Sequence, residues 1–113
     1  MKKFCIFICI FLGLACAAFT LHAAEMDADT ATAILKKNNC FKCHSMDKKK
    51  DGTPYREVAK KYKGKADAED KLFKHVTTAP KVKLEDGTEE EHKKIKTNGD
   101  DETRALIRWV LAL

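Results

Sequence analysis

The stretch Cys40-Phe41-Lys42-Cys43-His44 decides how the rest of this sequence is interpreted. Two thiols stand three residues apart, so one turn of chain can present both, and a histidine follows the second thiol directly. Paired cysteines with this spacing also occur in zinc sites and in thioredoxin-like redox pairs. A zinc site needs two further Cys or His ligands at close spacing, and a thioredoxin-like pair lies in a βαβ unit. The sequence shows neither pattern around the motif.

The spacing of the motif fits the covalent attachment of a haem. Two thiols on one turn can each add to a vinyl group on the same edge of a protoporphyrin. His44 then lies beneath the iron and can supply its proximal nitrogen. We therefore expect one haem c (iron) per chain, held by Cys40 and Cys43. A redox dithiol or a metal module without haem is the alternative.

The first 24 residues differ in kind from the rest of the 113-residue chain. Lys2 and Lys3 precede an apolar run over 4–21, and the small residues Ala23 and Ala24 come shortly after it, which is the pattern of a secretory signal peptide. We expect export to the periplasm, cleavage after Ala24, and one domain over 25–113 without a membrane span. A retained membrane anchor is the alternative, because a bilayer span takes roughly 17 to 25 apolar residues.

The cysteine count supports this division of the chain. Of five cysteines, three lie in the leader and two in the motif, so cleavage would leave the mature chain only the motif pair. The leader stretch that ends at Cys16 also resembles a lipoprotein processing site. Gly13, however, stands where that pattern has leucine.

Four segments show the apolar spacing of short helices, and a fifth signal predicts a hairpin. The helical segments are 27–39, 54–62, 66–76 and 100–113. Pro54 suits the first position of its helix. The expected N-caps of the other three are Asp27 or Asp29, Asp67, and Asp100 or Asp101. Asp86-Gly87 is a two-residue turn signal, which predicts a short β-hairpin near 82–90. The fold class is therefore small and all-α.

From the first helix to the C-terminus the sequence resembles class I cytochromes c. A short helix leads into CFKCH, Gly52-Thr53-Pro54-Tyr55 follows, and the chain closes with LIRWVL, which is similar to that family's last helix. The resemblance implies about four helices around one covalently bound haem. It also implies that the Pro54 carbonyl accepts the N–H of His44, and that Pro54 and Tyr55 pack near the haem.

The same family usually takes its second iron ligand from a methionine in a loop before the last helix. The methionines of this chain are Met1, Met26 and Met46, and none lies in that region. His92 does, at a separation from Trp109 close to the one that the family keeps between its ligand and the matching aromatic residue. We therefore expect His92 to bind the iron opposite His44.

Other ligands on the distal side remain alternatives. His75 is expected to be a surface histidine, because Leu72 and Val76 already define the apolar face of its helix. A rearranged loop would be needed for ligation by Lys81, Lys83, Lys93 or Asn98. A vacant sixth position would leave the iron open to NO, CO or another small ligand.

The distal ligand decides which function the sequence predicts. A second imidazole stabilises ferric iron better than a thioether does, so ligation by His92 predicts a low-potential carrier of single electrons, not an enzyme. An open or displaceable distal site would instead make the protein a haem-based NO or CO sensor.

The charge of the chain bears on its partners. Loss of Lys2 and Lys3 would lower the formal net charge from +5 to +3, with both signs interleaved, which does not indicate a nucleic-acid surface. We expect redox protein partners, and an acidic docking surface is compatible with the charge. The lysines at 48–50, close to the motif, are the candidates for guiding such docking.

Overall fold

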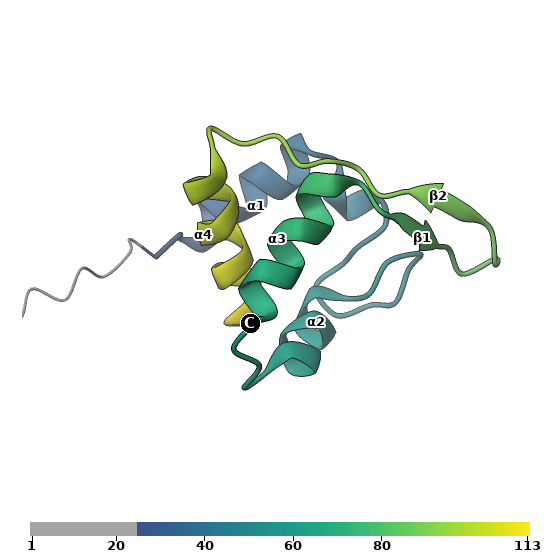
Figure 1. The fold of residues 1–113 in the computed structure, drawn as a ribbon, viewed down its shortest axis with the longest axis horizontal. Coiled ribbons are helices and arrows are strands. Elements are labelled where there is room, and N and C mark those ends of the chain that lie inside the picture. The colour runs from purple at the N-terminus through teal and green to yellow at the C-terminus, as the bar shows by residue number, and fades with distance from the viewer. Residues whose placement is uncertain (1–24) are drawn as a thin grey trace, which may run out of the picture.

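The structure, a computed structural model, describes residues 25–113; the predicted signal peptide over 1–24 lies outside the described residues. The described part contains four α-helices, a short 3-10 turn and one two-stranded antiparallel sheet (Figure 1). In chain order the elements are α1 Ala28–Lys37, η1 Cys40–Lys42, α2 Tyr55–Tyr62, α3 Ala68–Thr78, β1 Lys81–Lys83, β2 Glu89–Glu91 and α4 Asp100–Leu111. The prediction of an all-α fold is confirmed. None of these helices has the length and apolar character that a bilayer span requires.

Helix α4 is the centre of the packing, because it contacts each of the other three helices. The buried cluster combines side chains of α1, α2 and α4: Ala31, Leu35, Tyr55, Leu106 and Val110. Burial of one large apolar side chain contributes about 1.5–3 kcal/mol. The apolar spacing recognised in the sequence is therefore the spacing that buries these helices against one another.

Ion pairs join α3 to α4. Arg104 Nη1 lies 3.2 Å from a Glu69 oxygen and 2.9 Å from an Asp70 oxygen, and Arg108 Nη1 lies 3.1 Å from Glu69. All four side chains are partly or largely exposed, so the pairs stabilise the fold little. They lie along the contact between α3 and α4.

The first two helices begin close to where the sequence predicts. Asp27 is the N-cap of α1, and its carboxylate accepts the Thr30 N–H at 2.8 Å. Pro54 is the N-cap of α2 and not its first helical residue, so that prediction was wrong by one position.

The last two helices begin differently from the prediction. Asp67 is the N-cap residue of α3 but makes no side-chain cap bond, because its carboxylate pairs with Lys71 at 2.8 Å. Helix α4 begins at Asp100, with Gly99 at the N-cap, so the prediction that Asp100 or Asp101 caps it was wrong. Its acidic first turn is still favourable at the positive end of the helix dipole.

The predicted hairpin near 82–90 is confirmed, and it extends away from the helices (Figure 1). Lys81 lies opposite Glu91 and Lys83 opposite Glu89, so opposite charges face each other across the ribbon. Gly87 in the turn has a φ of 88°, a conformation that favours glycine. The hairpin reverses the chain after α3, and the segment that follows β2 therefore returns to the end of α3.

Candidate functional site

The CFKCH motif forms a single tight turn. It begins with the 3-10 turn η1, and the N–H groups of Cys43 and His44 both donate to the Cys40 carbonyl, at 3.3 and 3.0 Å. Cys40 and Cys43 are half-buried free thiols. The turn thus presents two thiols and an imidazole from one short piece of backbone, as the spacing in the sequence predicts.

The His44 ring is held on three sides. Its Nδ1 lies 2.7 Å from the Thr53 carbonyl oxygen, which places the proton on Nδ1 and leaves Nε2 free to bind a metal. The Tyr55 ring stacks on it, with centroids 5.0 Å apart and planes inclined by 21°. Gly52 lies against the ring edge, since a Cβ there would stand 2.6 Å from Cε1 and 2.7 Å from Nδ1.

The expectation that the Pro54 carbonyl orients His44 was wrong, because the acceptor belongs to Thr53. The reason lies in the start of α2. The Pro54 carbonyl accepts the N–H groups of Glu57 and Val58, both at 3.0 Å, and is thereby committed to the first turn of the helix. The Pro54 ring is fully buried.

Tyr55 is buried between the His44 ring and the motif turn. Phe41 meets it edge-on, with centroids 6.1 Å apart. Burial raises the pKa of the Tyr55 hydroxyl well above its ordinary value and also raises the pKa of the Cys40 thiol. Both groups are therefore uncharged at neutral pH. A neutral, largely apolar wall beside the motif suits a large apolar ring better than a charged ligand.

His92, the residue expected from the sequence to be the second iron ligand, lies close to His44. Its ring centroid is 6.2 Å from that of His44. Its Nδ1 lies 2.9 Å from the Lys93 carbonyl oxygen, which again leaves Nε2 free. Its backbone N–H donates to the Pro80 carbonyl at 2.8 Å, at the base of the hairpin.

The separation of the two rings fits one metal ion between them. Imidazole nitrogens bind a metal ion such as Zn²⁺ at about 2.0–2.1 Å, and the ring centre lies about 1.1 Å further back. Two rings whose binding nitrogens face each other across one ion therefore have centres about 6–6.5 Å apart. The observed 6.2 Å falls in that range. Within residues 25–113 no cluster of three or more His, Cys, Asp or Glu side chains could hold a metal ion by itself. The separation of the ring centres is therefore compatible with a metal that brings its other ligands with it, as in a haem.

His75 also lies at this site, so the prediction of a surface histidine was wrong. It is half-buried on α3, and its ring centroid is 4.5 Å from that of His92. Burial lowers the pKa of both rings, and each is lowered further by a neighbouring histidine. Helical periodicity could not show this contact, because the hairpin creates it when it returns the chain to the end of α3.

Asn38 is a residue of the site that the sequence analysis missed. It is only 7% exposed. Its side-chain amide donates to the Lys96 carbonyl at 3.0 Å, and its side-chain oxygen accepts the Lys96 N–H at 2.7 Å. The end of α1 is thereby tied to the loop that carries His92. The only sequence signal is an asparagine at a helix C-terminus, which is too common to reveal a contact with residue 96.

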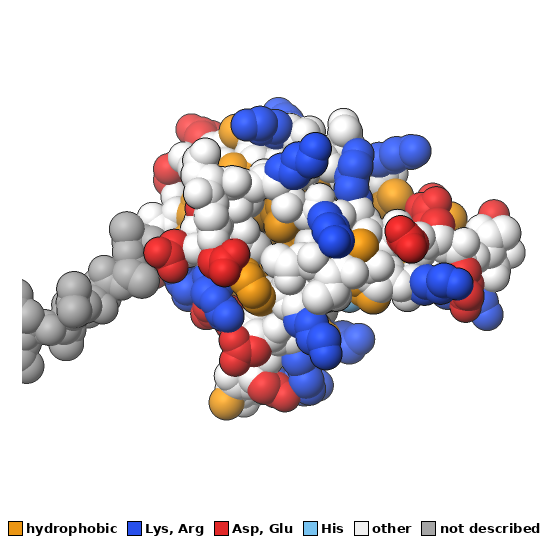
Figure 2. Space-filling view, turned by 45° about the horizontal axis from the view of Figure 1, so that its top comes forward, with side chains coloured by type: hydrophobic (Ala, Val, Ile, Leu, Met, Phe, Trp, Pro, Cys, Tyr) orange, Lys and Arg blue, Asp and Glu red, His pale blue; other side chains and the backbone are white. Residues whose placement is uncertain are grey.

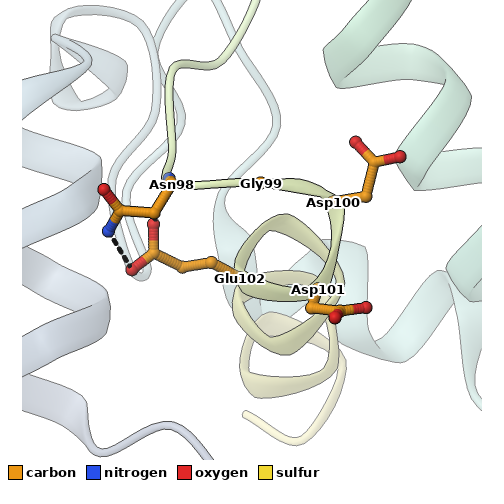
Figure 3. Close-up of a pocket in the computed structure, with 5 residues that line it drawn as sticks. All are labelled: Asn98, Gly99, Asp100, Asp101 and Glu102. Carbon is orange, nitrogen blue, oxygen red and sulfur yellow. Dashed lines mark hydrogen bonds between the residues drawn. The ribbon is translucent and has the colours of Figure 1, made fainter.

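A shallow hollow at the start of α4 contains none of these groups (Figure 3). It is lined by Asn98, Gly99, Asp100, Asp101 and Glu102. The Asn98 backbone and side-chain N–H groups donate to the Glu102 carboxylate at 2.8 and 3.0 Å, so these polar groups already serve to close the helix end. We assign it no ligand.

Comparison with known proteins identifies the family. The family model for cytochrome c matches residues 28–113, which is nearly the whole described chain. The chain belongs to the cytochrome c family. Members carry one covalently attached haem c, and Cys40, Cys43 and His44 fit the attachment motif. The resemblance to class I monohaem cytochromes c found in the sequence is thereby confirmed, and homologues of this kind transfer electrons.

The individual relatives agree with this assignment. Cytochrome c-551 of Pseudomonas aeruginosa strain PAO1 is 30% identical over 100 residues, which cover 85% of this chain and 88% of that protein. The class 1 cytochrome MtoD of Sideroxydans lithotrophicus ES-1 is 48% identical, with a TM-score of 0.71 over 78% of this chain and 97% of that one. Cytochrome c552 of Nitrosomonas europaea is 27% identical, with a TM-score of 0.57 over 73% and 98% of the two chains.

Proposed function

We propose that this cytochrome is exported and carries single electrons at low potential, with its haem iron bound by two histidines. Cys40 and Cys43 attach the haem, His44 is the proximal ligand and His92 the distal ligand. The observation that carries the proposal is the 6.2 Å separation of the two rings, each with its Nδ1 at hydrogen-bond distance from a backbone carbonyl.

The two carbonyls have a chemical role as well as an orienting one. The Thr53 and Lys93 oxygens each accept an Nδ1–H, which fixes the tautomer and makes the opposite nitrogen a stronger donor. Strong nitrogen donors stabilise ferric iron and lower the reduction potential. When bound, the haem supplies a one-electron change between ferric and ferrous iron. The protein contributes a coordination that stays the same in both states.

The backbone around His92 supports a coordination that stays the same in ferric and ferrous iron. The Asn38 side chain holds Lys96 through two hydrogen bonds, and the Ile95 N–H donates to the Val76 carbonyl of α3 at 2.9 Å. The His92 N–H donates to the Pro80 carbonyl, between α3 and β1. Three attachments over 92–96 therefore hold the distal segment, at the end of α1, on α3 and at the base of the hairpin. A ligand mounted in this way moves little when the iron changes charge.

Docking of redox partners is proposed at the lysines close to the motif. On the face shown in Figure 2, lysine and arginine side chains spread over the helical body with acidic side chains among them. Of the three candidates, Lys50 donates to the Phe41 carbonyl at 2.9 Å and Lys49 pairs with Glu85 at 3.4 Å. Exposed pairs are weak, so Lys48 and Lys49 stay available to an acidic partner.

The ligand assignment is tested by spectroscopy of the haem-loaded protein. Because His75 lies beside His92, the comparison is between His75→Ala and the double variant His75→Ala/His92→Ala. The single variant should give the low-spin ferric EPR signal of two axial nitrogens, and the double variant should lose it. A low-spin signal that survives in the double variant would show that His92 is not the distal ligand.

Export is tested separately by mass spectrometry. Protein recovered from a host with haem maturation should carry haem and begin at Glu25. A chain that retains Met1, or one modified with lipid at Cys16, would contradict the proposed cleavage. Either result would leave the ligand assignment standing.

A further inference from the structure

Two imidazoles from different elements lie side by side on the distal side of the site. His75 comes from α3, and His92 comes from the segment after β2. Their ring centroids are 4.5 Å apart, closer than the 6.2 Å between His92 and His44. Both side chains are half-buried, so they share one environment. The proposed function uses only one of them.

The two rings are mounted differently. His75 stands on a regular helix that Arg104 and Arg108 tie to α4. His92 stands on a segment without regular secondary structure, and its ring is held by one hydrogen bond, from Nδ1 to Lys93. Within residues 25–113, the His75 ring makes no hydrogen bond that would hold it in its present rotamer. A change of rotamer moves an imidazole by several ångströms, which is the scale of the gap between the two rings.

We propose that His75 is a reserve distal ligand, which binds the haem iron when His92 leaves it. This inference rests on the proposed function, because it takes His92 as the resident ligand. An imidazole that leaves the iron would normally open a coordination position. Here a second imidazole lies with its ring centroid 4.5 Å from that of His92, so a nitrogen of His75 would be available to take the vacated position.

The exchange has a functional consequence. A reserve ligand on α3 would keep CO and NO from the iron whenever the His92 ring alone is displaced, with the backbone of the distal segment still in place. The low potential is also kept, because the incoming group is again an imidazole. The pair therefore makes the protein a dedicated electron carrier and opposes the sensor function.

The test uses four haem-loaded proteins: the wild type, His75→Ala, His92→Ala and His75→Ala/His92→Ala. Ferric EPR at low temperature reports the axial ligands, and CO binding to the reduced protein reports an open position. A Lys74→Ala/His92→Ala protein is the matched control, because Lys74 is an exposed neighbour on the same helix. We expect His92→Ala and the Lys74 control to stay low-spin and not to bind CO. The variant that lacks both histidines should become high-spin and bind CO.

Each outcome separates the inference from the proposed function. If His92→Ala is high-spin while His75→Ala is low-spin, His92 is the ligand and the reserve role of His75 is wrong. If His75→Ala is high-spin while His92→Ala is low-spin, His75 is the resident ligand, and both proposals fall. Should His92→Ala not accumulate as folded protein, His92→Phe keeps an aromatic ring at the position and removes its nitrogens. The same low-spin signal is expected, and its loss would overturn the reserve role.

Discussion

Replacement of Gly52 by alanine tests how the proximal histidine is positioned. A Cβ at this position would lie 2.6 Å from Cε1 and 2.7 Å from Nδ1 of His44. Carbon atoms pack at about 3.5–4.0 Å, so the ring would have to move by roughly 1 Å. The new methyl group cannot easily retreat, because the Cys43 carbonyl oxygen lies 3.0 Å away on another side.

The shift would act on the hydrogen bond to Thr53. That bond is 2.7 Å long, and a displacement of roughly 1 Å would stretch it past the range of about 2.7–3.2 Å in which N–H···O bonds form. Without the carbonyl that accepts its Nδ1–H, the imidazole gives less electron density to the iron through Nε2. Ferric iron is then stabilised less, and the reduction potential rises. A hydrogen bond is worth about 0.5–1.5 kcal/mol, and if only the ferric state lost that energy the potential would rise by roughly 20–65 mV for one electron, which is the largest shift expected. Overpacking should lower the free energy of unfolding by about 1–3 kcal/mol.

Redox titration and urea unfolding of the haem-loaded protein measure both effects. Gly64→Ala is the matched control: Gly64 has a φ of 76°, and no atom lies within 4 Å of a Cβ built there. Alanine at that position strains only its own backbone, by about 1–2 kcal/mol. The control should therefore lose stability and keep its potential. A Gly52→Ala protein with the potential and stability of the wild type would refute this account of the proximal side.

Three further predictions concern the distal segment, the first helix and the docking surface. Asn38→Ala leaves the Lys96 N–H and carbonyl without their partner and should cost about 1–3 kcal/mol in urea unfolding. Lys37→Ala, at an exposed neighbour in α1, should cost less, and equal losses would contradict the role of Asn38. The Thr30 hydroxyl and N–H hold the pKa of Asp27 below its ordinary value of 3.8. The charged cap therefore stabilises the fold above pH 3.8, and this stabilisation is lost as the pH falls through the lowered pKa. Acid unfolding should be less steep for Asp27→Asn, and an unchanged profile would count against the cap. Lys48→Glu/Lys49→Glu should slow reduction by an acidic partner and weaken the dependence of the rate on salt. The control Lys60→Glu/Lys61→Glu should change the rate and its salt dependence less. Identical effects would show that docking is not localised.

The sequence was most informative where spacing and local chemistry decide the structure. The turn of CFKCH and the cap of Asp27 follow from neighbours in the chain, and their contacts are local. The hairpin followed from Asp86-Gly87. The acceptor of His44 was assigned one residue too late. The resemblance implied that the Pro54 carbonyl accepts the His44 N–H. In the structure that carbonyl is bound within the first turn of α2, and the Thr53 carbonyl lies at hydrogen-bond distance from the His44 ring.

Contacts between segments far apart in the chain could not be predicted from the sequence. The helical pattern predicts that His75 is a surface residue, because nothing in its own turn shows that the hairpin will bring His92 beside it. Asn38 and Lys96 meet across 58 positions, and neither residue type signals the other. The position of His92 could be anticipated only through the family resemblance, since a histidine in a charged run is usually an exposed one.

Ferric EPR combined with redox titration of the haem-loaded His75→Ala protein measures most directly whether His44 and His92 bind the iron from opposite sides. We predict a low-spin signal of two axial imidazoles and a low potential, both lost when His92 is also replaced by alanine. A high-spin signal in the single variant, or a low-spin signal unchanged in the double variant, would contradict the account.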